Sequence, residues 1–154
     1  MKLTVAIPTV VGREAYLRSC LQTCVSQDVD DVEFLVSDNS FGVASEVVAS
    51  FDDPRIRYVR PPSYLPMAAH WDYVVSQVQG DMVTIIGDDD GLMPGALSRV
   101  LDLQRDFGLM PIHHVLAQYG WPDHPEPRDR NTYWFIHPPE TGVSVLSGAD
   151  FLTH

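Results

Sequence analysis

Residues 82–90 constrain this chain more than any other segment. An apolar, strand-forming run at 82–86 ends at Gly87, which is followed by three adjacent carboxylates, Asp88, Asp89 and Asp90. A central strand of a parallel sheet is typically a continuous apolar run, and open α/β sheets bind ligands at the carboxyl ends of their strands. Carboxylate oxygens are hard ligands suited to Mg²⁺ or Mn²⁺. The segment therefore predicts a metal or phosphate site at the end of a buried strand, with a solvated acidic turn as the alternative.

The charge of the chain excludes several classes of partner. The formal net charge is −11 over 154 residues, of which 20% are charged and 45% hydrophobic. Nucleic-acid and anionic-membrane surfaces need basic patches, so neither is an expected partner. The phosphates of a bound nucleotide would instead need a metal ion or local hydrogen-bond donors. The length is that of one domain with a substantial core.

Neither the cysteines nor the amino-terminal segment predicts a special compartment. Cys20 and Cys24 are four residues apart in a helical pattern and are predicted to be buried thiols, because no His pair is spaced to complete a zinc site. The first apolar stretch is broken at Pro8 and is too short for a signal peptide or a transmembrane span. A cytoplasmic protein without a transmembrane segment is expected.

Strand and helix patterns alternate along the first two thirds of the chain. Strand-like runs cover residues 3–7, 32–37, 56–59 and 82–86, and helical patterns cover 13–27, 44–51, 71–78 and a segment that opens at Pro94. This order predicts an α/β fold with a Rossmann-like, mostly parallel sheet and helices on both faces. Two strands end in acidic turns, at Asp38 and at Asp88, and both turns should lie at the same edge of the sheet.

The remaining residues have a different character. Residues 113–119 and 132–136 could form strands around a Pro-rich, charged surface loop at 120–131. Residues 147–150 have the form of a helix capping box, but a helix of about one turn is not stable alone. We therefore expect a C-terminally truncated chain, whose character changes after residue 108.

Six segments between residues 2 and 105 carry recognisable motifs in a fixed order: 5–9, 13–17, 34–40, 53–58, 80–83 and 87–97. In this order and spacing the sequence resembles the family 2 glycosyltransferases, which have the GT-A nucleotide-sugar-binding fold. The resemblance implies a nucleotide-sugar-binding half at 1–108 and the start of an acceptor-side half at 109–154. Each segment alone is weakly specific, and their combination is strong. It implies transfer of a sugar, with inversion, from a nucleotide sugar to an acceptor hydroxyl, with help from a divalent cation, Mn²⁺ or Mg²⁺.

The resemblance also implies a nucleotide-binding role for five residues. Pro8 and Thr9 would lie beside the base and ribose, and Arg13 could reach the base or the diphosphate, or be a solvated residue of the first helical turn. Asp38 would accept a hydrogen bond from the base, most often uracil in this family, with an ordinary turn residue as the alternative. Asp88 would bind the ribose or the sugar.

The metal site follows from the same motif, with departures. Asp89 would coordinate the cation together with Asp88, and Asp90 would be either an outer ligand or the cap of the helix that opens at Pro94. Many relatives have Asp where this chain has Gly87, and many have Arg where it has Trp71. The Trp side chain fits the apolar stripe of its helix, so we expect it in the core.

No catalytic base is predicted. The family's base lies in the acceptor half. The acids available there are Asp123, Glu126, Asp129 and Glu140, and the spacing of none of them indicates a catalytic base. The expected partners are a UDP-type nucleotide sugar and a saccharide or lipid-linked acceptor, which would place the protein in the cytoplasm or at the inner membrane face. The alternatives are a non-catalytic nucleotide-binding module that needs a partner chain or a missing C-terminal half, and, more distantly, a receiver-like regulatory domain.

Overall fold

The structure is a computed structural model that describes residues 1–113, 117–121, 123–135 and 147. It divides the chain into two compact units, Met1–Ile112 and His113–His154. Each unit is described by itself.

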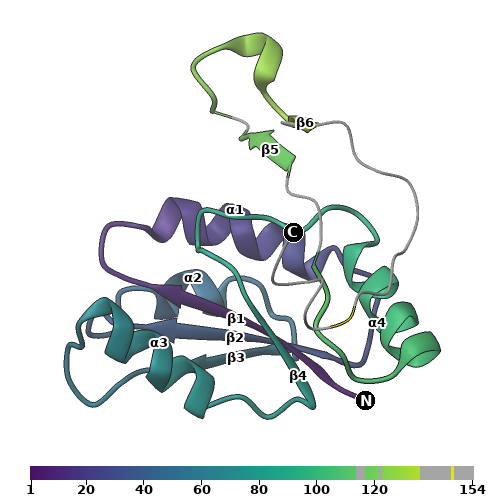
Figure 1. Cartoon of the computed structure of the whole chain (residues 1–154). Helices are drawn as coiled ribbons and strands as arrows, with labels where there is room; N and C mark the ends of the chain where they lie inside the picture. Colours follow the sequence, from purple (N-terminus) through teal and green to yellow (C-terminus); the bar gives the residue numbers. More distant parts are fainter. Residues whose placement is uncertain (114–116, 122, 136–146, 148–154) are drawn as a thin grey trace. The chain divides into compact units, whose positions relative to one another are not determined.

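The first unit is built on a parallel sheet of four strands in the order β3-β2-β1-β4 (Figure 1). The strands are β1 (Leu3–Thr9), β2 (Val32–Asp38), β3 (Ile56–Val59) and β4 (Met82–Ile85). All three neighbouring pairs are parallel, and Thr9 at the end of β1 pairs with Asp38 at the end of β2. The predicted parallel sheet is confirmed, and the carboxyl ends of β1 and β2 meet at one edge.

Helices cover both faces of this sheet, as predicted (Figure 1). They are α1 (Glu14–Val25), α2 (Ser45–Ala49), α3 (Met67–Ser76) and α4 (Ala96–Phe107). Side chains of α1, α2 and α4 share one core with Val5 and Ile7 of β1, whereas Val74 of α3 packs with Ala6 and Leu35 on the other face. Successive side chains of a strand point to opposite faces, which explains this alternation along β1.

The position of β4 differs from the prediction. Among the described strands β4 lies at the edge of the sheet rather than in its centre, and Val83 is 44% exposed. The continuous apolar run is compatible with both positions, because burial depends on which strands flank it.

The buried face of α3 also differs from the prediction. Trp71 and Val75 are 44% and 47% exposed, whereas His70 and Val74 are buried. A polar residue therefore takes the inward position, and its ring nitrogen lies 2.9 Å from the hydroxyl of Ser37 on β2. This hydrogen bond makes burial of His70 tolerable, and it turns the Trp71 side of the helix toward solvent.

The second unit contains an antiparallel pair formed by β5 (Ala117–Gly120) and β6 (Thr132–Phe135). A 3₁₀ turn, Pro127–Asp129, lies in the connection between them. β6 falls within the run predicted at 132–136, and β5 overlaps the run predicted at 113–119 but ends one residue later, at Gly120. Glu140 and the predicted capping box, apart from Ser147, lie outside the described residues. Among the described helices, none has the length and apolar character needed to cross a membrane.

Candidate functional site

Two regions distant in sequence, residues 9–13 and the acidic turn at 88–90, meet at the carboxyl edge of the sheet. The hydroxyl of Thr9, at the end of β1, donates to Asp88 Oδ2 at 2.6 Å. Arg13, directly before α1, donates from Nε to Asp88 Oδ1 at 2.7 Å, and its Nη2 lies 2.6 Å from Asp89 Oδ2. Four residues predicted from the sequence to form a site are therefore in direct contact.

Arg13 is the cation that neutralises this acidic turn. Its hydrogen bonds with Asp88 and Asp89 raise the pKa of the guanidinium above its usual value, although partial burial opposes the shift. The guanidinium also lies 4.8 Å from the centre of the Tyr16 ring, a cation–π distance. The like-charge repulsion evident in the sequence is thus offset within the chain.

The two paired carboxylates differ in accessibility. The Asp88 side chain is 5% exposed and has a protein donor on each oxygen, whereas the Asp89 side chain is 55% exposed and is paired with Arg13 through Oδ2. Asp88 is therefore fixed in position, and Asp89 is open to solvent and to a ligand.

Asp90 stabilises the acidic turn itself and does not cap a helix, which corrects one of the two predicted roles. Its Oδ2 accepts from the Gly87 N–H at 2.7 Å. Helix α4 begins only at Ala96, after Gly95 in the left-handed region (φ 76°), and has no side-chain cap. The residues between the turn and the helix move Asp90 out of capping range.

Gly87 lies against the side chains of the acidic turn. A Cβ atom there would lie 2.6 Å from Asp89 Oδ1 and 3.0 Å from Asp90 Oδ2. The acidic residue that many relatives have at this position would therefore require these two carboxylates to shift.

Asp38 is buried, and its carboxylate is filled by donors from the loop that follows it and from Tyr58 of β3. Oδ1 accepts from the Ser40 N–H at 2.8 Å and from the Ser40 hydroxyl, and Oδ2 accepts from the Tyr58 hydroxyl at 2.6 Å and the Ala44 N–H at 3.2 Å. Burial alone would raise the pKa of Asp38, but these hydrogen bonds outweigh it and hold the pKa below its usual value. A contact between Asp38 and a nucleotide base stays a prediction.

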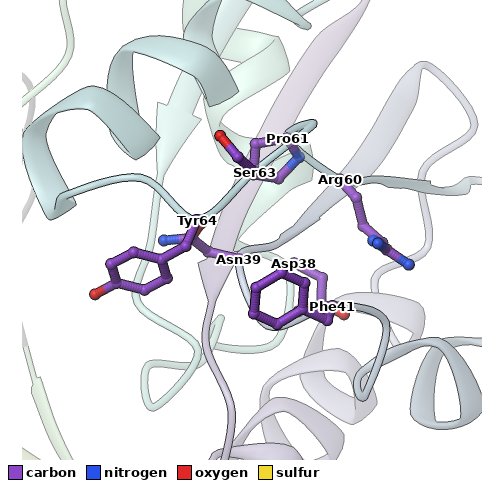
Figure 2. Close-up of a pocket in the computed structure, with 7 residues that line it drawn as sticks. All are labelled: Asp38, Asn39, Phe41, Arg60, Pro61, Ser63 and Tyr64. Atoms are coloured by element: carbon purple, nitrogen blue, oxygen red, sulfur yellow. The ribbon is translucent and has the colours of Figure 1, made fainter.

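An open hollow lies beside Asp38. Figure 2 shows the residues that line it: Asp38, Asn39, Phe41, Arg60, Pro61, Ser63 and Tyr64. A neighbouring hollow shares Asn39, Phe41 and Tyr64 and adds Val10 and Val11. Phe41 and Tyr64 are 75% and 65% exposed, so the edge of the sheet presents aromatic surface to solvent.

These aromatic residues were not among the predicted site residues. Their positions depend on loop hydrogen bonds: the Asn39 side chain donates to Leu65 O at 2.8 Å and accepts from Leu65 N at 3.0 Å. The sequence signal that could have found Phe41 is its position three residues after Asp38, whereas Tyr64 is distant in sequence and has no such signal. Pro8 is half-buried in β1 and pairs with Ser37 of β2.

The acidic turn suits a divalent cation only in part. Within the described residues, no three or more His, Cys, Asp or Glu side chains are grouped to hold a metal ion. Mg²⁺, however, is usually bound by one or two carboxylates plus substrate phosphates and water. Asp89, with Asp88 next to it, offers oxygen ligands of this kind, so the donor set fits a cation shared with a phosphate-bearing ligand.

The chain belongs to glycosyl transferase family 2, whose family model matches residues 4–144. A similar protein is the GalNAc(5)-diNAcBac-PP-undecaprenol beta-1,3-glucosyltransferase of Campylobacter jejuni. It is 35% identical over 104 residues, which cover 65% of this chain and 33% of the relative. Membership of the family confirms the resemblance found in the sequence.

Solved structures support the same fold. A crystal structure of S. aureus TarS matches with a TM-score of 0.62 at 19% identity, covering 69% of this chain and 33% of that one. A second TarS structure, in complex with UDP-GlcNAc, matches with a TM-score of 0.61 at 20% identity and covers 69% of this chain and 32% of that one. The GT-A fold is thereby confirmed, and the chain spans about a third of the length of these relatives.

Proposed function

We propose that this chain binds the donor for an inverting glycosyltransferase that uses a UDP-type nucleotide sugar. The acceptor would be a hydroxyl of a saccharide or lipid-linked molecule, reached at the cytoplasmic face of a membrane. The observation that carries the proposal is the cluster of Thr9, Arg13, Asp88 and Asp89 at the carboxyl edge of a parallel sheet. Family membership and the UDP-GlcNAc complex of TarS support the choice of donor.

The nucleoside would lie over the hollow beside the acidic turn. Phe41 and Tyr64 offer exposed aromatic surface for the base, and Pro8 and Thr9 mark the side on which the ribose would lie. Every nucleotide base can stack on an aromatic side chain. Specificity for uracil would therefore need hydrogen bonds, such as one to Asp38. Because its carboxylate is filled, Asp38 would have to exchange a donor in order to contact a base.

The diphosphate would lie at the acidic turn. Asp89 would hold a divalent cation, with Asp88 fixed behind it by the hydroxyl of Thr9. A bound cation would supply positive charge that offsets the charge developing on the departing nucleoside diphosphate. The Arg13 guanidinium would donate two hydrogen bonds to oxygens of the diphosphate.

The base that would deprotonate the acceptor is not assigned. Asp123 and Glu126 are exposed and Asp129 is half-buried next to Arg128, as expected of loop charges. Transfer requires a base within hydrogen-bond reach of a positioned hydroxyl. The 154-residue chain should therefore bind donor but show little or no sugar transfer, and a robust metal-dependent transfer would contradict this part of the proposal.

A melting experiment tests the function. UDP or a UDP-sugar with Mn²⁺, at about 100 times its Kd, should stabilise the chain by about 2.7 kcal/mol. Asp89→Asn should lose the Mn²⁺-dependent part, whereas the control Asp72→Asn, an exposed acid of α3, should keep it. An unchanged Tm at millimolar nucleotide with Mn²⁺ contradicts the proposal. If the chain binds the nucleotide but no longer form of the protein transfers the sugar or hydrolyses the nucleotide sugar, the result would favour a non-catalytic nucleotide-binding module.

A further inference from the structure

The contacts of Arg13 raise a question that the proposed function leaves open. The guanidinium holds one oxygen of Asp88 and one of Asp89, at 2.7 and 2.6 Å. These are the two carboxylates expected to hold the cation. We propose that Arg13 is an internal counter-ion that competes with the divalent cation, so that cation binding and release of Arg13 are coupled.

The competition follows from how the oxygens of Asp88 are used. Oδ2 accepts from Thr9, which is itself 3% exposed, and Oδ1 accepts from Arg13. A cation that approached Oδ1 would lie beside the Arg13 guanidinium, whose Nε is 2.7 Å from the same oxygen, and the two positive charges would repel each other. At Asp89 the same guanidinium holds Oδ2, and a doubly charged ion beside it would meet strong like-charge repulsion.

The surroundings of Arg13 allow it to leave. Its side chain is 32% exposed, and it makes no side-chain cap hydrogen bond at the start of α1. Gly12, in the left-handed region at φ 84°, has no atom within 4 Å of the position of a Cβ, so the preceding loop is open. The Tyr16 ring supports one face of the guanidinium and can retain it after the ion pairs break.

The inference rests on the proposed function, and it specifies the order of exchange at that site. Without a cation, Arg13 neutralises the turn. With a cation and a donor diphosphate, Arg13 is released from the carboxylates and faces the phosphate oxygens instead. Cation and nucleoside diphosphate should therefore bind cooperatively, because each favours the same position of Arg13.

Mn²⁺ titration followed by electron paramagnetic resonance, without nucleotide, tests the competition in the full chain. Arg13→Gln should bind Mn²⁺ at least about fivefold more tightly than the wild type, the lower end of typical coupling between sites. Arg18→Gln, which removes one exposed positive charge from the same helix, is the matched control and should leave the Mn²⁺ affinity unchanged. Equal or weaker Mn²⁺ binding by Arg13→Gln, or no binding by either protein, overturns the proposal.

A second measurement uses the wild-type chain and does not depend on the folding of a variant. The Arg13 Nε–H resonance should exchange slowly with solvent in the free chain and rapidly at saturating Mg²⁺. An unchanged exchange rate overturns the proposal.

The two hypotheses fail in distinguishable ways. If UDP with Mn²⁺ stabilises the wild type but Arg13→Gln has an unchanged Mn²⁺ affinity, the competition is wrong and the donor-binding function stands. If Mn²⁺ binding tightens in Arg13→Gln but no nucleotide stabilises either protein, the function is wrong and the competition stands.

Discussion

Two arginine–carboxylate clusters lie at opposite ends of the same sheet and differ in how completely they are enclosed. At the amino end of β2, Glu33 accepts from Thr4, Arg57 and the Gln79 N–H at 2.9 to 3.2 Å, and its side chain is 4% exposed. At the carboxyl end, Asp89 is paired with the guanidinium of Arg13, and its side chain is 55% exposed.

The difference separates a structural carboxylate from one that can exchange its partner. Replacing any one donor of Glu33 leaves the others in place, and water has little access to the carboxylate. At Asp89 one guanidinium can be exchanged for another cation with little rearrangement. The same residue types therefore stabilise the fold at one edge and offer a ligand site at the other.

The largest effect should come from breaking the enclosed cluster. Glu33→Ala leaves Arg57 partly buried without its carboxylate and should lower the free energy of unfolding by about 3 kcal/mol. Urea denaturation would measure it, with the exposed Glu46→Ala on α2 as a control that should change little. A loss of the size seen in the control would mean that the Glu33 cluster contributes no more than surface charge.

Acid should lower the stability of the fold in two stages, one for each of the buried side chains His70 and Glu33. Burial lowers the pKa of His70, so its contribution is present above about pH 6.5 and is lost as the pH falls below that value. For Glu33, burial alone would raise the pKa, but hydrogen bonds from Arg57 and Thr4 outweigh it and hold the pKa below its usual value. The contribution of Glu33 is therefore present above about pH 4 and is lost below it.

For each extra proton that the unfolded chain binds, the free energy of unfolding should fall by about 1.4 kcal/mol for every unit by which the pH is lowered. Urea denaturation between pH 3 and pH 8 would show the two stages, and Glu33→Gln should have the shallower slope below pH 4. A variant slope equal to that of the wild type would rule out Glu33 as a source of the acid sensitivity.

A smaller effect is expected where the site meets the core. Thr9→Val removes the donor to Asp88 Oδ2 but keeps the shape of the side chain, and should lower the free energy of unfolding by about 1 kcal/mol. Thr9→Ser retains the hydroxyl and serves as the control. If the valine variant is as stable as the wild type, Asp88 is not held by Thr9 and is as exchangeable as Asp89.

The smallest effect on stability should be at the open carboxylate. Asp89→Asn loses its ion pair with Arg13 but relieves repulsion with Asp88 and Asp90, so the free energy of unfolding should change by less than about 0.5 kcal/mol. Its affinity for Mn²⁺ should nevertheless fall by at least roughly tenfold. Unfolding of this variant would show that Asp89 is structural and would remove the contrast between the clusters.

Periodicity predicted most of the fold, and it was wrong where a polar side chain replaced an apolar one. The stripe of α1 identified its buried face, because Leu17, Cys20, Leu21 and Cys24 all repeat at helical spacing. On α3 the same reasoning found Val74, which is buried, but it was wrong for Trp71, because His70 takes the inward position through its contact with Ser37. A pattern of apolar residues cannot register such a hydrogen bond.

The candidate site was predictable to the extent that it follows from strand order. The acidic turn after β4 and Thr9 at the end of β1 share an edge, as parallel strands require. For Arg13 the sequence left two roles open, and neither was that of counter-ion to Asp88. The reason is that the contact depends on the conformation of the loop between β1 and α1, which local residue preferences do not determine.

Phe41 has a consequence for selection. It holds a left-handed backbone (φ 61°), which costs a residue other than glycine roughly 1 kcal/mol, and it leaves its ring 75% exposed to water. On stability alone, glycine or asparagine is the better residue at this position. In a library selected only for thermal resistance, Phe41 should be replaced early, whereas a library selected for donor binding should retain it. The rate at which this position drifts would thus report whether the loop is under selection for a ligand.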